Sequence, residues 1–170
     1  IADLVADEQD IQIMYGIGGE KQLTERELDW LGGYAGSRPV RVGNAAYAQR
    51  QHDVWGTILD SFYLHTKSRD MLPERVWPML ERLVGEAIEN WREPDRGIWE
   101  VRGDPKHFTT SKLMCWVAAD RGARLAEIRE ELEYAARWQN AADEIKKDIC
   151  DNALDDRGVF CQHYETDALD

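Results

Sequence analysis

The sequence has 170 residues, enough for one domain with a sizeable core, and a formal net charge of −12. A surface of that sign repels nucleic-acid phosphates and anionic lipids, so we expect neither nucleic-acid nor membrane partners, and no apolar run is long enough to span a bilayer. Three cysteines without C-x-x-C spacing argue against a disulfide scaffold or a zinc site and favour a reducing, cytoplasmic setting. The chain starts without Met and stops at Asp170 in an apparent helix start, so we expect both ends to be cuts within a longer protein.

The N-terminal part of the chain predicts little regular structure. Residues 11–15 (Ile-Gln-Ile-Met-Tyr) predict a short strand or extended piece, and the glycines at 16–19 predict a turn after it. The run from Thr24 to Leu28 resembles a capped helical turn.

Two helices of different character follow. From Asn44 to about His65 the apolar stripe is wide, which is typical of a helix buried on more than one side, and Asn44 is its expected N-cap. From Pro73 to Trp91 the apolar residues share one face, as in an ordinary surface helix. Pro73 fits the first turn of that helix, whereas Pro78 indicates either a later start or a kink.

The same order then recurs. Residues 111–125 contain an unbroken apolar run from Leu113 to Ala119, which only a helix surrounded by protein tolerates, and residues 109–111 offer it an N-cap. Residues 130–149 are amphipathic again. Alternating buried and surface helices predict an all-α fold of helix pairs, as an open solenoid or a closed ring. Five tryptophans lie at helical core spacings and are expected to pack there: Trp55, Trp77, Trp91, Trp116 and Trp138.

The loops before the buried helices resemble one another. Their glycines, Gly36, Gly97 and Gly158, are 61 residues apart both times, which indicates a structural repeat. In a closed ring such loops gather at one end of the axis, so we expect a site where the three loops meet.

The second of these loops carries the most informative residues. Glu100 lies between Trp99 and Val101, and a carboxyl group packed against an apolar ring loses solvent, which favours the acid form that a general acid requires. Glycoside hydrolysis needs such an acid together with a second carboxylate. The plainer alternative is an exposed loop carboxylate that pairs with Arg102.

Several short sequence motifs, in a fixed order along the chain, resemble those of a known family. The chain resembles the bacterial branch of glycoside hydrolase family 15, the family of glucoamylases and α,α-trehalases, along essentially its whole length. The matching phrases occupy residues 12–17, 19–20, 33–34, 36–46, 51, 53–56, 95–103, 107–109, 111–112 and 160–170.

The resemblance implies a fold, a chemistry and a set of site residues. The fold is an (α/α)6 toroid of alternating inner and outer helices, of which the chain would hold about half. The chemistry is hydrolysis of α-linked glucosides with inversion, with Glu100 as the general acid. We expect no cofactor and no metal-binding residues in this sequence, and the sequence leaves a metal or phosphate requirement of the whole enzyme open. Ile98 and Trp99 match positions that line the first sugar subsite. Four further residues match the bacterial pattern and are expected to face the same end of the ring, where the loops meet: Arg41, Arg102, His107 and Lys112.

The chain departs from the family in ways that matter. Fungal members have Trp at the position of Gly36 and an acidic residue at that of Val101, so contacts of those groups do not carry over. The family's upstream substrate loop and its catalytic base fall outside the 170 residues. We therefore expect these residues alone to be inactive, and the exposed sides of half a ring to favour self-association or pairing with the missing part.

Several alternatives stay open at this point. Trehalose is the first expected substrate and maltooligosaccharide or dextrin the second. A helical-repeat module that binds a partner protein would use the same loops without catalysis. Toroidal epimerases and lyases need a proton-abstracting residue, for which His107 is the best candidate. Asp53 either orients a substrate-facing arginine or is simply solvated at a helix surface.

Overall fold

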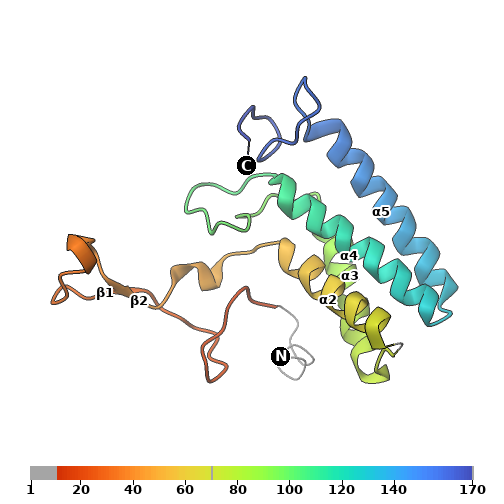
Figure 1. Ribbon diagram of the computed structural model, residues 1–170, viewed down its shortest axis with the longest axis horizontal. Helices are drawn as coiled ribbons and strands as arrows, with labels where there is room; N and C mark the ends of the chain where they lie inside the picture. The colour runs from red at the N-terminus through yellow and green to blue at the C-terminus, as the bar shows by residue number, and fades with distance from the viewer. Residues whose placement is uncertain (1–10, 70, 170) are drawn as a thin grey trace. The chain divides into compact units, whose positions relative to one another are not determined.

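The structure, a computed structural model, describes residues 11–69 and 71–169. These residues fall into two compact units that divide after Arg50, and each unit is considered by itself. The first unit holds two short strands, and the second holds the four α-helices (Figure 1). A mostly helical chain with a short extended segment near its N-terminus is what the sequence predicted.

The first unit is built on a small antiparallel pair. Strand β1 (Arg26–Glu27) pairs with β2 (Arg41–Val42), and Leu28 N donates to Val40 O at 2.8 Å beyond the pair. The predicted helical turn at 24–28 is therefore wrong, because pairing with a segment 14 residues away satisfies the backbone groups that a helix would have used. The turn at 16–19 is confirmed by Gly19 N donating to Gly16 O at 3.0 Å. Residues 11–15 form no strand.

The first buried helix starts later than predicted. Asn44 does act as a cap, since its side chain accepts a hydrogen bond from Ala46 N at 2.9 Å, but it caps the short 3-10 helix η2 (Ala45–Ala48). A second 3-10 helix, η1 (Tyr34–Gly36), precedes it. Helix α2 runs from Asp53 to Arg69, after an interruption of extended backbone at Gln49.

The other helices follow the predicted order with shifted ends. After the 3-10 turn η3 (Glu74–Val76), α3 covers Trp77–Asn90 with Pro78 in its first turn, so Pro78 marks a later start rather than a kink. Helix α4 covers Thr109–Ile128 and α5 covers Leu132–Asn152. The predicted N-cap of α4 is wrong: the N-cap position is Phe108, whose side chain has no acceptor, and the Thr109 hydroxyl donates to Cys161 O at 2.6 Å.

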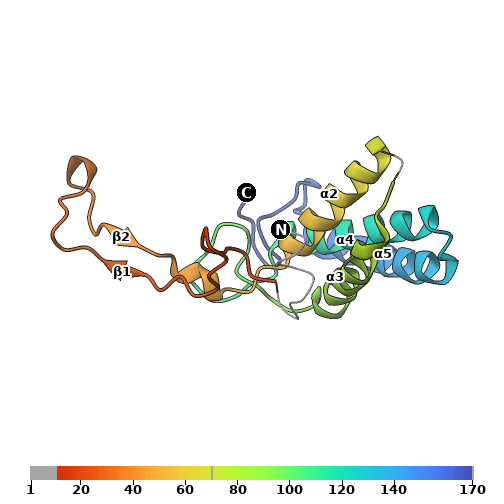
Figure 2. The ribbon, with the colours of Figure 1, turned by 90° about the horizontal axis from the view of Figure 1, so that it is seen from below.

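Helix α4 is the centre of the second unit. It packs against α2, α3 and α5, and Figure 1 shows it running between α2 and α5. Figure 2 shows α3 below α2 and α4 in the turned view. The outer helices α3 and α5 also meet directly, since the Trp77 ring lies 5.7 Å from that of Trp138. The central place of α4 is as predicted for a buried helix, with α3 and α5 packed on it as surface helices.

Burial distinguishes α4 from the other three helices. More than half of the residues of α4 are buried, whereas α3 and α5 bury one stripe each. Helix α2 is less enclosed than predicted: only Trp55, Gly56, Leu59 and Thr66 are buried, and Leu64 is exposed within this unit. Four of the five core tryptophans are confirmed as buried, and Trp116 is half-buried.

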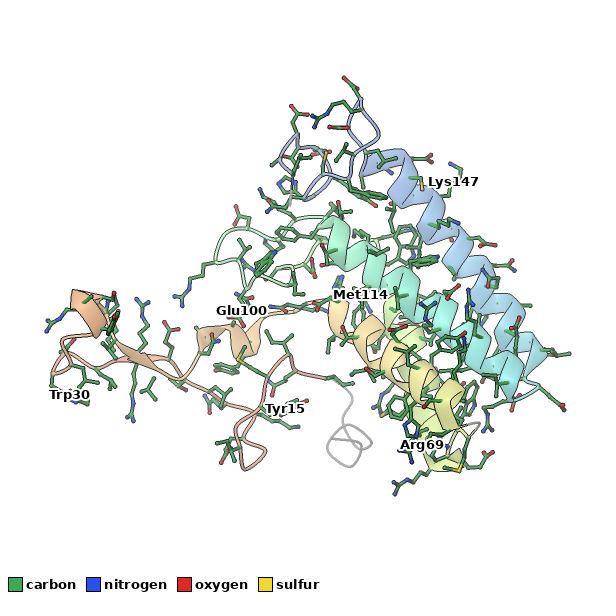
Figure 3. The ribbon with its side chains drawn as sticks, in the orientation of Figure 1. Tyr15, Trp30, Arg69, Glu100, Met114 and Lys147 are labelled. Carbon is green, nitrogen blue, oxygen red and sulfur yellow. The ribbon has the colours of Figure 1, made fainter. Side chains whose placement is uncertain are left out.

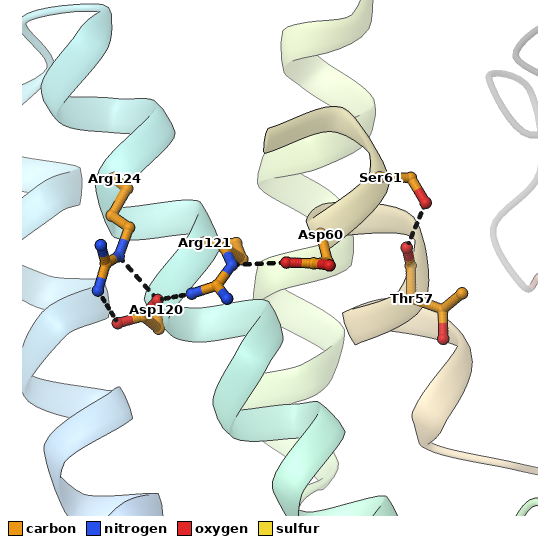
Figure 4. Close-up of polar contacts among 6 residues, drawn as sticks. All are labelled: Thr57, Asp60, Ser61, Asp120, Arg121 and Arg124. Carbon is orange, nitrogen blue, oxygen red and sulfur yellow. Dashed lines mark hydrogen bonds and ion pairs between the residues drawn. The ribbon is translucent and has the colours of Figure 1, made fainter. Parts of the chain in front are cut away.

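A polar network joins the two inner helices (Figure 4). Arg121 donates to Asp60 on α2 and to the buried Asp120 on its own helix, and Arg124 also holds Asp120. The guanidinium groups of Arg121 and Arg124 both lie over the Tyr63 ring. These charged groups are therefore paired, which burial beside apolar helices requires.

Candidate functional site

The loop that carries Glu100 is closed at its base. Asp95 N donates to Lys106 O at 3.0 Å, and Lys106 N donates back to Asp95 O at 2.9 Å. The residues between them form a projecting loop, and Figure 3 labels Glu100 on it. Four predicted site residues lie together on this loop: Ile98, Trp99, Glu100 and Arg102.

The backbone of this loop includes two left-handed residues. Gly97 has φ +65°, and a Cβ there would lie 2.9 Å from the Phe108 ring. Glu100 itself has φ +52°, a conformation that side chains other than glycine rarely adopt. Strained backbone of this kind often occurs at functional sites, although it does not identify one by itself.

The repeated glycines share one backbone conformation. Gly36, Gly97 and Gly158 have φ values of +77°, +65° and +75°. A left-handed residue at each of the three positions explains why glycine recurs at the 61-residue spacing. The interpretation of these loops as a repeat is therefore supported by their local geometry.

Glu100 is open to solvent in the second unit. Its side chain and that of Trp99 are both exposed, the latter at 71%, and Ile98 is exposed as well. The apolar enclosure that the sequence led us to expect for the Glu100 carboxyl is not formed by residues 51–69 and 71–169. The aromatic and aliphatic neighbours of Glu100 instead present open surface.

Asp95 is a polar residue whose importance the sequence analysis missed. It is 3% exposed, and its Oδ2 accepts hydrogen bonds from His52 N at 2.9 Å and from the Ser111 hydroxyl at 2.7 Å. His52 directly precedes α2 and Ser111 lies in the first turn of α4. One buried oxygen thus ties the base of the Glu100 loop to the starts of both inner helices.

The C-terminal loop lies against the Glu100 loop. Thr109 N donates to Gln162 O, and Tyr164 N donates to His107 O, both at 3.0 Å. An isolated bridge also pairs Phe108 with His163. Two of the three repeated loops therefore gather at the same ends of the inner helices, as predicted. The third belongs to the first unit.

His107 and Lys112 line a cavity of about 330 Å³ beside these loops. His107 is half-buried, its ring stacks on Tyr164 at 5.9 Å, and burial followed by the charge of Lys112 lowers its pKa. The Tyr164 hydroxyl donates to Asp148 Oδ2 at 2.8 Å, at the C-terminal end of α5. The cavity therefore lies among the ends of α3 and α5 and the start of α4.

Lys112 has a role that the sequence did not suggest. It is 2% exposed, and its ammonium group donates to the carbonyl oxygens of Trp91 and Glu93, the latter at 2.8 Å. These carbonyls follow α3, so the lysine joins the end of an outer helix to the start of an inner one. Burial lowers the pKa of Lys112. Its contact with substrate stays a prediction.

Arg41 is held by carboxylates of its own unit. Its guanidinium lies 3.0 Å from Glu27 Oε1 and 3.3 Å from Glu25 Oε1, across the β1–β2 pair. A substrate contact for Arg41 also stays a prediction.

Among the described residues, no group of three or more His, Cys, Asp or Glu side chains has the arrangement of a metal site. None of the helices is long and apolar enough to span a membrane.

Comparison with known proteins identifies the family. The family described as "Glycosyl hydrolases family 15" matches residues 2–170. The chain is 64% identical over 160 residues to a protein of Mycobacterium tuberculosis named "Trehalase", covering 94% of this chain and 24% of that protein. A "Trehalase" of Mycolicibacterium smegmatis is 60% identical with the same coverage. "Trehalase 2" of Sulfolobus acidocaldarius is 36% identical, covering 92% of this chain and 27% of that protein.

The chain spans about a quarter of the length of these relatives. No solved structure matches it at a significant level. The family match covers nearly every residue, and a mostly helical chain is what an all-α family predicts. The chain belongs to glycosyl hydrolase family 15 and forms part of its all-α toroid.

Proposed function

We propose that the complete protein hydrolyses an α-linked glucoside with inversion, and that Glu100 is its general acid. The observation that carries the proposal is the position of Glu100, which directly follows Trp99 on a closed loop of a family 15 chain. Trehalose is the first expected substrate because several relatives are named trehalases, and maltooligosaccharide or dextrin is the second.

In this proposal Glu100 protonates the glycosidic oxygen as the bond to the anomeric carbon breaks. A carboxylate outside the 170 residues activates water on the opposite face of the sugar. Ile98 and Trp99 provide exposed apolar surface for the glucose ring, consistent with their open positions beside Glu100. Arg102 and His107 are proposed to contact substrate hydroxyls from the same end of the helices.

A glutamine substitution tests the acid in the complete protein. Glu100→Gln keeps the shape of the side chain but removes the acidic proton, so glucose release from trehalose should fall by about two to four orders of magnitude. Glu130→Gln is a matched control, because Glu130 is also an exposed glutamate with a left-handed backbone, φ +64°, in the turn after α4. Unchanged activity of Glu100→Gln would overturn the assignment.

The anomeric products test inversion. Inversion at one carbon of trehalose releases one β-glucose and one α-glucose, whereas retention releases α-glucose only. Proton NMR in the first minutes of reaction distinguishes equal amounts of both anomers from the α anomer alone.

If the complete protein cleaves neither trehalose nor maltooligosaccharides, a non-catalytic helical-repeat interaction module becomes the better explanation. The cytoplasmic location and the self-association expected from the sequence stay predictions.

A further inference from the structure

The Asp95 carboxylate is placed to control the loop that holds Glu100. Its Oδ2 accepts two hydrogen bonds, from His52 N at 2.9 Å and from the Ser111 hydroxyl at 2.7 Å. The donors belong to the starts of two different inner helices, 43 residues before and 16 residues after Asp95. The buried Asp95 Oδ2 thus fixes the base of the Glu100 loop to the starts of α2 and α4.

The connection from Asp95 to Glu100 is short and constrained. The backbone bridge between Asp95 and Lys106 closes the loop at its base. Gly97 then turns the chain directly over the Phe108 ring, where a Cβ would come within 2.9 Å. Only Ile98 and Trp99 separate this turn from Glu100. A shift at Asp95 would therefore be transmitted to the acid through a few residues with little freedom.

We infer that Asp95 is a positioning residue for the general acid, an inference that rests on the proposed function of Glu100. A general acid contributes mainly in the transition state, and a displacement of about 1 Å can lower the rate about 100-fold. Asp95 is buried and contacts backbone and hydroxyl groups of the protein, so it acts through the loop and not on the sugar.

The test compares two substrates in the complete protein. Trehalose requires protonation of its leaving oxygen, whereas α-glucosyl fluoride releases fluoride, a stable anion that depends far less on an acid. Asp95→Leu removes both hydrogen bonds and should lower kcat on trehalose about 100-fold while changing turnover of α-glucosyl fluoride only a few-fold. Asp104→Leu, at an exposed carboxylate of the same loop, is the matched control and should leave both activities unchanged.

An asparagine at position 95 should keep Glu100 in its active position. Because both hydrogen bonds use the same oxygen, Asp95→Asn keeps an acceptor for both donors and should have nearly normal activity on trehalose. Ser111→Ala removes one of the two bonds and should give an intermediate loss with the same preference for the fluoride. If Asp95→Leu does not fold, Ser111→Ala and Asp95→Asn still give the answer.

The outcomes separate this inference from the proposed function. Equal losses on both substrates in Asp95→Leu and Ser111→Ala would indicate a merely structural carboxylate and overturn the inference, as would full activity of both variants on trehalose. Full activity of Glu100→Gln on trehalose would instead overturn the acid assignment itself, and with it the positioning role. Loss of trehalose activity in Glu100→Gln with normal behaviour of Asp95→Leu would leave the acid assignment standing and remove only the positioning role.

Discussion

The guanidinium of Arg121 on α4 donates a 2.6 Å hydrogen bond to Asp60 on α2 and at the same time holds the buried Asp120 of its own helix (Figure 4). The side chains of Arg121 and Asp60 are only 23% and 35% exposed, so solvent screens this pair less than most surface pairs. It links the two inner helices, α2 and α4.

A double-mutant cycle measures that link. Arg121→Met and Asp60→Asn, separately and together, should show a coupling of about 1 kcal/mol in the free energy of unfolding measured with denaturant. The Arg92–Glu144 pair is more than half exposed at both side chains and serves as the comparison. Its coupling should be smaller, and a larger value there would contradict the importance of partial burial.

Two helical glycines should respond oppositely to alanine. A Cβ at Gly56 on α2 would lie 2.1 Å from the Met114 carbonyl oxygen on α4, so Gly56→Ala must push the inner helices apart. The expected loss of stability is about 1–3 kcal/mol. At Gly85 on α3 a Cβ would meet no atom within 4 Å. Gly85→Ala should therefore raise the free energy of unfolding by about 0.5–1 kcal/mol. Thermal unfolding of the two variants checks the contrast.

Asp53 should make stability depend on pH. Burial raises the pKa of Asp53 above its ordinary 3.8, its backbone hydrogen bond opposes this, and the charge of Asp95 adds to it. Its Oδ1 is buried and has no hydrogen-bond partner among the described residues. A raised folded-state pKa means that the folded protein holds the proton more tightly than the unfolded chain, so stability is lost as pH rises through that pKa.

Replacing Asp53 by asparagine removes this penalty. Asp53→Asn should raise the unfolding temperature at pH 7, and the advantage should shrink as pH falls toward 4, because the folded-state carboxyl, whose pKa is raised, becomes protonated. Asp104→Asn, at an exposed carboxylate, should shift the unfolding temperature at neither pH. An advantage of Asp53→Asn that grows toward low pH would contradict the sign of the pKa shift.

Tyr164 should stabilise the fold through two separate contacts. Its hydroxyl binds Asp148, and its ring stacks on His107. Tyr164→Phe removes only the hydrogen bond and should lower stability by about 1 kcal/mol. Tyr164→Leu also removes the stacking and should cost more, by about a further 0.5–1 kcal/mol. Denaturant unfolding of both variants distinguishes these contributions, and equal losses would mean that the ring contact adds nothing.

The sequence alone determined the order of the helices and the recurrence of the glycine-containing loops. Hydrophobic periodicity is a local property, so α3, α4 and α5 were predictable to within a few residues at their ends. The recurring glycines were predictable as a repeat because a left-handed turn favours glycine wherever it occurs. The assignment of Glu100 rests on its place in a short family-like motif after Trp99, and it stays a prediction.

Only the tertiary structure decided the features that depend on residues far apart in sequence. Strand β1 forms because β2 pairs with it, although the sequence of residues 24–28 resembles a helical turn. The Thr109 hydroxyl binds Cys161 O, 52 residues later in the chain. The role of Asp95 depends on donors 43 residues before it and 16 residues after it, and no local pattern could show that they meet. Hydrogen-bond partners across a fold are chosen by packing, which a one-dimensional pattern does not contain.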